Sequence, residues 1–562
     1  MSASLDCIER CCPRESGTPS RREVAEILVQ FDTLDSSWTS CRQIADQLDV
    51  PARTLHHWVG RERTLIENSS WPESVTRFLE TPEGLDLLHR LFTAAHLAFV
   101  QASDCGLRNL GWFLQLSGLD TFIAPSYGAQ QAVAKEMESL LVRFGEEEDQ
   151  RLAASMPPRE ITLCEDETFH PQICLVAIEP VSNFILVEQY QPKRDAKTWQ
   201  QCTGAKLAGL PVTVCQVTSD AAKALISQAE TCLGAYHSPD LFHVQYDTVK
   251  ATSGALASQT HAACRELEKR QRKTAEFQAK RQADPEACRP GSLVDVLARQ
   301  AQETEAVASQ RVHVCQARQE RARAARKGLS RDYHPVDLAT GQPLEAEEVG
   351  RRLQSHFDTL DQVADEASLS AQARAKLAKA RRLLSAMQAT VAFFWTTIAT
   401  RLAAWGYDPA VQQWLRQELI PAYYLRRVAQ KAGTAQERQR LRTLAAEVLA
   451  RARSPDGPWG TFSSELQAEL ESRARQCADL FQRSSSCVEG RNGQLSLRHH
   501  ALHRLTARKL QALTVLHNYA VQRADGSTAA GRFYGTEPQD LFAWLLRRFP
   551  FPARPRATRR AA

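Results

Sequence analysis

Three acidic residues, Asp166, Asp220 and Glu489, stand where carboxylates from distant segments can meet at one site. Asp166 ends a short run of apolar and β-branched residues, and Asp220 directly follows another such run. Glu489 lies near the start of a later segment with helical character. Phosphoryl transfer on DNA uses two divalent metal ions held by a few carboxylates. These three residues are therefore predicted to be both the metal ligands and the catalytic groups of one centre.

The apolar runs predict the sheet that would position the first two carboxylates. Four strands are expected, at residues 161–166, 173–178, 184–187 and 211–217. Pro180–Asn183 predicts a hairpin turn between the second and third strands, and a helix is expected at 221–234. Three strands, a helix, a strand and a helix form the order of a ribonuclease H-like mixed sheet. Asp166 and Asp220 would then share one edge of that sheet, although Asp220 alone equally fits a helix N-cap.

The segment around Glu489 carries a more specific pattern. Residues 484–495 contain Ser-Ser-x-x-Val-Glu-x-x-Asn-x-x-Leu. This string resembles the glutamate motif of DDE transposases of bacterial insertion sequences, and Asp166-Glu-Thr168 is similar to their first-aspartate motif. The resemblance implies two Mg²⁺ ions, with Mn²⁺ as a substitute, held by the three acidic residues. Gln482 and Ser485 depart from the tyrosine, arginine, glutamate, lysine signature of one large insertion-sequence group, so the subfamily stays open.

Three further residues are expected near this centre. Arg491 and Asn492 follow Glu489 and are predicted to contact DNA phosphates or metal-bound water, with surface ion pairing as the alternative. His243, in Asp240-Leu-Phe-His243, matches an Asp-x-x-His element of hAT and Mutator-like relatives. The resemblance makes His243 an active-site neighbour, and a core histidine is the equal alternative.

A helix-turn-helix is predicted near the N-terminus. Residues 40–58 place Ile44, Ala45 and Leu48 on one helix, a turn at Val50-Pro51, and Leu55 and Trp58 on a second helix. This pattern leaves four polar side chains facing outward as candidate DNA contacts: Arg53, His56, His57 and Arg61. An ordinary helical hairpin would show the same pattern.

The expected fold is an α/β ribonuclease H-like catalytic domain with a large all-helical insertion, preceded by an all-α helix-turn-helix domain. Its predicted parts are a flexible arm (1–19), the helix-turn-helix domain (20–66), a helical linker (67–157), the first part of the catalytic core (158–249), the insertion (250–480), the second part with Glu489 (481–548) and a basic tail (549–562). Within the insertion, residues 261–330 hold 15 Lys and Arg against 9 Asp and Glu. This excess suits a DNA-facing helix pair, and solvated helix faces would look similar.

Composition narrows the class of protein. Hydrophobic residues form 43% of the chain and charged residues 24%, which is typical of a globular protein. The net charge of +5 does not by itself indicate a polyanion partner. Evidence for DNA binding must therefore come from local clusters of basic residues. The N-terminus lacks an apolar leader and the cysteines are scattered. We therefore expect reduced thiols, no membrane association and a cytoplasmic protein of a bacterium, at the nucleoid when bound to DNA.

Together these features predict a transposase that binds the terminal inverted repeats of an insertion sequence and catalyses metal-dependent cleavage and strand transfer. Its partners would be double-stranded DNA, both element ends and target, and a second copy of the chain, since joining two ends needs at least a dimer. Two alternatives remain. The first is a sequence-specific DNA-binding regulator or an inactive or domesticated transposase, and the second is a helical scaffold in which the acidic triad is a coincidence.

Overall fold

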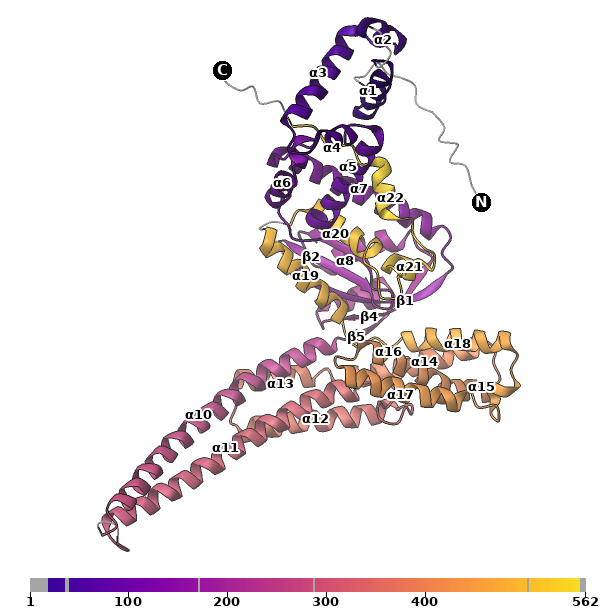
Figure 1. The fold of residues 1–562 in the computed structure, drawn as a ribbon. Helices are drawn as coiled ribbons and strands as arrows, with labels where there is room; N and C mark the ends of the chain where they lie inside the picture. The colour runs from indigo at the N-terminus through magenta and orange to yellow at the C-terminus, as the bar shows by residue number, and fades with distance from the viewer. Residues whose placement is uncertain (1–18, 36–39, 170–171, 287–288, 503–504, 556–562) are drawn as a thin grey trace. The chain divides into compact units, whose positions relative to one another are not determined.

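A computed structural model describes residues 19–35, 40–169, 172–286, 289–502 and 505–555 (Figure 1). The chain forms two compact units: residues 1–155 with 496–562, and residues 156–495. The predicted segment 481–548 is thus divided between them, with Glu489 in the second unit. The predicted arm lies outside the described residues except for Pro19, and so do Arg556, Arg559 and Arg560 of the predicted tail.

The described part of the first unit begins with three helices, of which the second and third match the predicted helix-turn-helix. They are α1 (Arg21–Asp35), α2 (Cys41–Gln47) and α3 (Ala52–Asn68). Ser40 and Gln43 form a reciprocal capping box that starts α2. Ile44 and Leu55 are fully buried in a small shared core, against which Leu48 and Val50 of the turn pack. A helix, a turn and a second helix therefore stand where the pattern placed them.

The rest of the first unit is also helical. Its remaining elements are α4 (Glu73–Phe78), α5 (Pro82–Ala95), η1 (His96–Gln101), α6 (Leu107–Leu116), η2 (Leu119–Thr121), α7 (Tyr127–Ala153), α20 (Ala507–Tyr519), α21 (Ala529–Tyr534) and α22 (Leu541–Arg548). The C-terminal helices pack on the linker helices, because the Phe144 ring of α7 contacts Tyr519 and Trp544 edge to face.

The second unit contains a five-stranded mixed sheet. The strands are β1 (Arg159–Phe169), β2 (Ile173–Glu179), β3 (Phe184–Gln191), β4 (Val212–Ser219) and β5 (Tyr236–Pro239), with α8 (Ala196–Leu207), α9 (Lys223–Ser227) and η3 (Gln228–Cys232) between them. Their order is β3-β2-β1-β4-β5. β2 runs antiparallel to both of its neighbours, β1 and β3, whereas β4 runs parallel to β1 and β5 parallel to β4. The four predicted strands are present.

Two details of the sheet differ from the prediction. β1 continues to Phe169, so Asp166 lies inside the strand and pairs with Val176 instead of ending it. The antiparallel ladder to β2 provides hydrogen-bond partners for these extra residues. β5 was not predicted, because its four residues, Tyr236–Pro239, lack a run of apolar side chains. Pairing with β4 makes them a strand.

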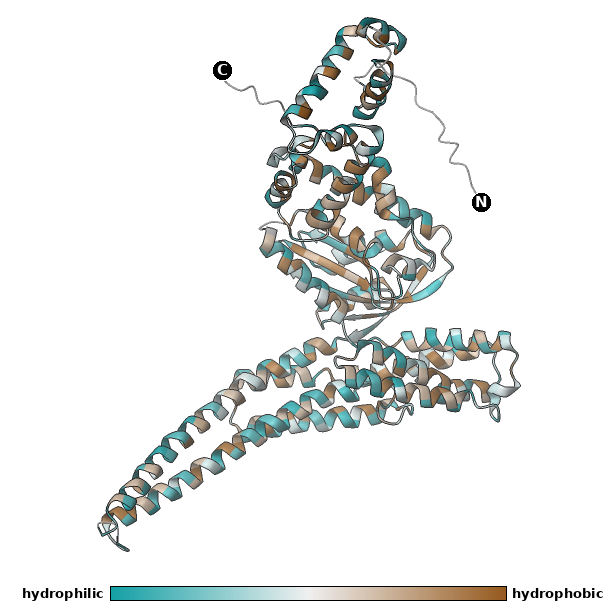
Figure 2. Ribbon diagram, viewed as in Figure 1, coloured by the Kyte–Doolittle hydropathy of each residue, from teal (hydrophilic) through white to brown (hydrophobic). Residues whose placement is uncertain are grey.

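The described residues of the predicted insertion are helical apart from connecting loops, one of which contains an isolated β-bridge between Val336 and Pro343. The insertion comprises α10 (Leu241–Ala283), α11 (Leu293–Asp332), α12 (Ala346–Glu366), α13 (Ala371–Arg381), α14 (Leu384–Ala404), α15 (Pro409–Trp414), η4 (Leu415–Leu419), α16 (Ile420–Lys431), α17 (Ala435–Ala452), η5 (Pro458–Thr461) and α18 (Ser464–Asp479). α10 and α11 form a long antiparallel hairpin. α13 packs against α10 and α12 against α11, and the tip of the hairpin extends beyond them (Figure 1). Hydrophilic and hydrophobic residues alternate along this hairpin, whereas the strands are mostly hydrophobic (Figure 2).

The insertion has its own core. Phe394, Trp395 and Trp414 are buried in it, and Trp405 packs against it. By length and composition alone, the helical stretch 371–404 is long and apolar enough to cross a membrane. Its α14 part contributes seven buried side chains, and a core helix meets the same criterion.

Candidate metal centre

Three ionisable side chains from distant parts of the sequence converge in the second unit. They are Asp166 on β1, His243 on α10 and Glu489 in the first turn of α19 (Ser486–Leu502). One ligand atom of each lies within 4.8 Å of the other two. Carboxylate oxygens and an imidazole nitrogen are ordinary ligands of divalent ions, so this group fits a metal site. The structure brings together two of the three predicted acidic residues, and it adds His243.

Asp220 lies beside this group. The last paired residues of β1 and β4 are Cys164 and Thr218, and Asp166 and Asp220 each come two residues later. Because the strands are parallel, both aspartates lie at the same edge of the sheet, as predicted. Asp220 is not one of the three converging residues, and its Oδ1 accepts a hydrogen bond from Ala222 N at 3.0 Å. Asp220 is nevertheless not a helix N-cap, because α9 begins only at Lys223 and its N-cap is Ala222, which makes no side-chain capping bond.

Asp240 holds His243 in place. It caps the N-terminus of α10, where its Oδ1 accepts a hydrogen bond from Phe242 N at 2.9 Å. Its Oδ2 lies 2.8 Å from His243 Nδ1. Asp240 is almost fully buried, whereas the His243 side chain is 32% exposed. A carboxylate at Nδ1 fixes the tautomer and leaves Nε2 as the atom that can bind a ligand.

The segment before α19 is tied to the sheet and to α10. Ser485 donates two hydrogen bonds to Asp240, from its backbone N to Oδ1 at 2.9 Å and from Oγ to Oδ2 at 2.7 Å. Leu241 N donates to Arg483 O at 2.9 Å, and Gln216 Nε2 on β4 donates to Gln482 O at 2.7 Å. These bonds fix the start of α19. They thereby fix the position of Glu489, which lies in the first turn of this helix.

α19 buries one face, and that face contains two residues predicted to contact DNA. Val488, Arg491, Asn492 and Leu495 follow a helical spacing and are all buried. Arg491 makes a two-pronged ion pair with Glu188 on β3, at 2.7 and 2.6 Å. Asn492 Nδ2 donates to Asp166 Oδ2 at 3.1 Å. In this structure Arg491 therefore anchors α19 to the sheet and Asn492 positions Asp166, because neither guanidinium nor amide faces outward.

Burial and neighbouring charges shift the pKa values of the site. Burial, helped by Glu489, raises the pKa of Asp166 to about 7, and burial raises that of Glu489. The bond to Asp240 raises the pKa of His243 to about 9, and the charges of Asp166 and Asp220 add to this effect. Burial disfavours the Asp240 carboxylate, but the hydrogen bonds from His243 and Ser485 outweigh it and lower its pKa. The site thus places the cationic ring of His243 beside two carboxyl groups, those of Asp166 and Glu489, that bind protons more readily than usual.

The predicted contacts of the helix-turn-helix lie on α3. Arg53, His56 and His57 are exposed, and Arg61 is half-buried. Burial and the nearby Arg554 lower the pKa of Arg61, while Glu80 opposes this effect. The outward orientation predicted for Arg53, His56 and His57 is therefore present, whereas Arg61 belongs to a charge cluster on its own unit.

A basic stripe follows the outer half of α10. Arg265, Lys269, Arg272, Lys273 and Lys280 are all exposed. At 3.6 residues per turn they fall within about 100° of the helix circumference. Glu276 is the acidic residue on the same stripe. The charge excess noted in the sequence is thus partly gathered on one helix face.

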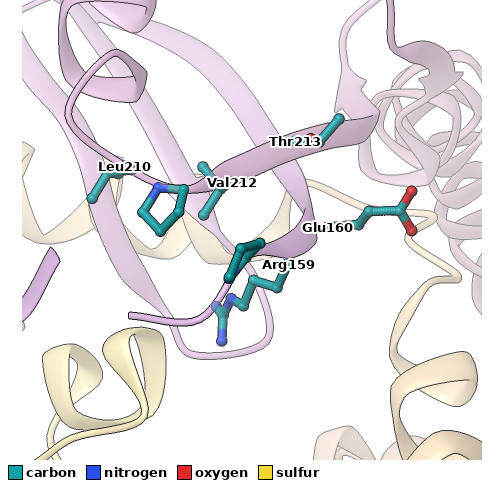
Figure 3. A pocket seen from close by; sticks show the side chains of 7 residues that line it. Arg159, Glu160, Leu210, Val212 and Thr213 are labelled. Carbon is teal, nitrogen blue, oxygen red and sulfur yellow. The ribbon is translucent and has the colours of Figure 1, made fainter. Parts of the chain in front are cut away.

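A surface pocket lies at the opposite edge of the sheet from Asp166. Figure 3 shows its lining at the starts of β1 and β4. It is formed by Pro158, Arg159, Glu160, Leu210, Pro211, Val212 and Thr213. Glu160 is ion-paired with Arg401 of α14. The pocket is therefore separate from the converging residues.

Three residues that hold the site together were not predicted as site residues: Asp240, Ser485 and Glu188. Asp240 lies three residues before His243, at the start of a helix, which is the position of an N-cap. A capping role for Asp240 could therefore have been predicted from the sequence. Its hydrogen bonds to Ser485 had no sequence signal, because 245 positions separate the two residues. The ion pair of Glu188 with Arg491 had none for the same reason.

Comparison with known proteins finds one family model that matches part of the chain, and this family has no known activity. Residues 415–561 match a family of unknown function, DUF6399. This match includes α19 with Glu489 and the C-terminal helices. No curated protein and no solved structure matches the chain.

Proposed function

We propose that this chain is a DDE-type DNA transposase, which binds the ends of an insertion sequence and cuts and rejoins DNA at the centre formed by Asp166, Asp220 and Glu489. The observation that carries this proposal is the convergence of Asp166 and Glu489, with His243, beside Asp220 at one edge of the sheet. The arrangement of three antiparallel strands, a helix and a fourth strand parallel to the first supports a ribonuclease H-like core.

The donor set of the site suits divalent ions. Two carboxylates and an imidazole lie within reach of a single ion, and we propose that Asp220, at the same edge of the sheet, joins them when ions bind. Bound divalent ions would supply Lewis-acid activation of an attacking oxygen and stabilisation of a leaving oxygen. Asn492 orients Asp166 and Asp240 orients His243, so the ligands are held before any ion or DNA arrives.

DNA would be bound by α3 of the first unit and by α10 of the second. Arg53, His56 and His57 are among the exposed side chains of α3, and they suit base contacts from the second helix of a helix-turn-helix. The basic stripe on α10 suits phosphate contacts. Cleavage by a chain of this kind requires the DNA partner and the metal centre together.

Nicking of supercoiled plasmid DNA by the purified full chain tests the proposal. With Mn²⁺ or Mg²⁺ the parent chain is expected to convert supercoiled DNA to open circles, and chelation is expected to stop this reaction. Asp166→Asn, Asp220→Asn and Glu489→Gln should each abolish it, while the exposed Glu268→Gln on α10 should not. DNA binding without metal-dependent nicking by the parent chain would instead support the regulator or inactive transposase.

A further inference from the structure

We infer that His243 is itself a metal ligand, held by Asp240, and that the site therefore prefers a divalent transition-metal ion such as Mn²⁺ over Mg²⁺. This inference rests on the proposed function, because it names the ion that the same centre would take. It adds an imidazole nitrogen to the carboxylate ligands expected from the sequence, which makes a mixed set of oxygen and nitrogen donors.

The first argument is geometric. A nitrogen of His243 and carboxylate oxygens of Asp166 and Glu489 lie mutually within 4.8 Å, so one ion between them is within reach of all three. Nδ1 is occupied by Asp240, whose Oδ2 lies 2.8 Å away. A carboxylate behind a metal-binding imidazole is a recurrent arrangement that fixes the tautomer and raises the basicity of the ligand.

The second argument comes from Asn492. Asn492 is 9% exposed, and its Nδ2 donates to Asp166 Oδ2. Its Oδ1 is buried and has no hydrogen-bond partner among the described residues. A buried amide oxygen without a partner is costly, so a polar ligand beside Asp166 would satisfy it. An ion with its bound water is one such ligand.

The third argument is ligand chemistry. Mg²⁺ prefers oxygen ligands in near-ideal octahedral geometry and gives up its water reluctantly. An imidazole nitrogen suits first-row transition metals better than it suits Mg²⁺. Because one of the protein donors is an imidazole, the metal preference of the site therefore shifts from Mg²⁺ toward Mn²⁺ and the heavier first-row ions.

The alternative role for His243 is that of a cation. A protonated ring beside Asp166 and Glu489 would neutralise them in place of an ion. The two roles predict opposite outcomes when the ring is removed. Loss of a ligand weakens metal binding, whereas loss of a competing positive charge strengthens it.

Metal binding by the full chain without DNA tests the inference. Free Mn²⁺ is measured by electron paramagnetic resonance, and Mg²⁺ is added as a competitor. The parent chain is expected to bind Mn²⁺ more tightly than Mg²⁺, because one of its donors is an imidazole. His243→Gln should weaken Mn²⁺ binding about 10- to 100-fold, and His243→Asp should restore Mg²⁺ binding relative to Mn²⁺. His261→Asp, at an exposed position of the same helix, should change neither affinity.

The outcomes separate the two proposals. If Asp166→Asn abolishes metal binding while His243→Gln leaves Mn²⁺ affinity unchanged or increases it, the ligand role of His243 is wrong and the proposed function stands. If the parent chain binds neither ion, both fail. Because His243 is partly exposed, its variants are expected to fold, and circular dichroism checks this.

Discussion

Asp240 and Ser485 are 245 positions apart in the sequence, and two hydrogen bonds of 2.9 and 2.7 Å join them in the structure. The bonds link the start of the helical insertion to the segment that follows it. Asp240 begins α10 directly after β5, and Ser485 directly precedes α19. The two ends of the insertion therefore meet beside the sheet, and His243 and Glu489 emerge from this junction next to Asp166.

Removing the Ser485 hydroxyl should weaken this junction. Ser485→Ala leaves the buried Asp240 Oδ2 with one hydrogen bond fewer, which is expected to lower the free energy of unfolding by about 1–3 kcal/mol. Urea unfolding followed by circular dichroism measures the change. Ser486→Ala, at the exposed neighbouring position, is the control and should have little effect. Equal destabilisation by both variants would contradict the role of the Asp240 bond.

Breaking the ion pair between Arg491 and Glu188 should be more damaging than breaking a surface pair. Both side chains are buried, so Glu188→Gln leaves the Arg491 charge without its partner and should destabilise the chain by about 3–5 kcal/mol. The exposed pair of Arg77 with Glu73 is the comparison, and Glu73→Gln should cost less than about 1 kcal/mol. Replacing both Glu188 and Arg491 with methionine should recover much of the lost stability, which urea titration would show.

The stability of the first unit should fall in mild acid because of His96. The ring is fully buried, with Nε2 2.9 Å from Gln130 Oε1, and burial lowers its pKa from 6.5 to about 4. Between these values the unfolded chain binds the proton more readily, so stability falls as the pH drops below about 6.5. The loss is complete below about pH 4 and reaches at most about 3 kcal/mol.

Hydrogen exchange of peptides from α5 and α7, measured at pH 7 and pH 4.5, reports this loss. His96→Gln should flatten the difference between the two pH values. His57→Gln, at an exposed position of the same unit, should leave it unchanged. A parent chain whose α5 and α7 are equally protected at both pH values would show that His96 does not limit stability.

Charge reversal on the α10 stripe should weaken DNA binding and its dependence on salt. The double variant Lys269→Glu and Arg272→Glu removes two exposed positive charges, and the slope of log affinity against log salt should fall by about 2. Fluorescence anisotropy with duplex DNA at several salt concentrations measures the slope. Arg442→Glu with Arg451→Glu on α17 makes the same change of net charge elsewhere on the insertion. An equal loss in both double variants would indicate a net-charge effect instead of a binding surface.

Arg53 and His57 should determine sequence preference. Selection from a random duplex pool with the parent chain is expected to yield a preferred site. Arg53→Ala and His57→Ala should each reduce discrimination at particular base pairs by about 1–3 kcal/mol, because base-edge contacts carry specificity. Arg143→Ala, on the exposed surface of α7, should leave the selected site unchanged. Selection of no preferred site by the parent chain would contradict a sequence-reading role for α3.

Local sequence patterns were sufficient to predict much of the secondary structure in both units. The apolar runs predicted β1 to β4, and the pattern of Ile44, Ala45 and Leu55 predicted α2 and α3, since periodicity and capping act over a few residues. Acidic residues following two parallel strands also predicted that Asp166 and Asp220 would share a sheet edge. Each of these inferences depends on neighbours in the sequence.

Tertiary structure alone decided how the site is assembled. It replaced Asp220 with His243 in the converging group, turned Arg491 inward to Glu188 and placed Asn492 on Asp166. It also made a strand of Tyr236–Pro239, which has little strand character of its own. These outcomes depend on hydrogen bonds and burial between segments hundreds of residues apart. Local propensity carries no information about such pairings, because their free energy appears only when the sheet, the insertion and α19 pack together.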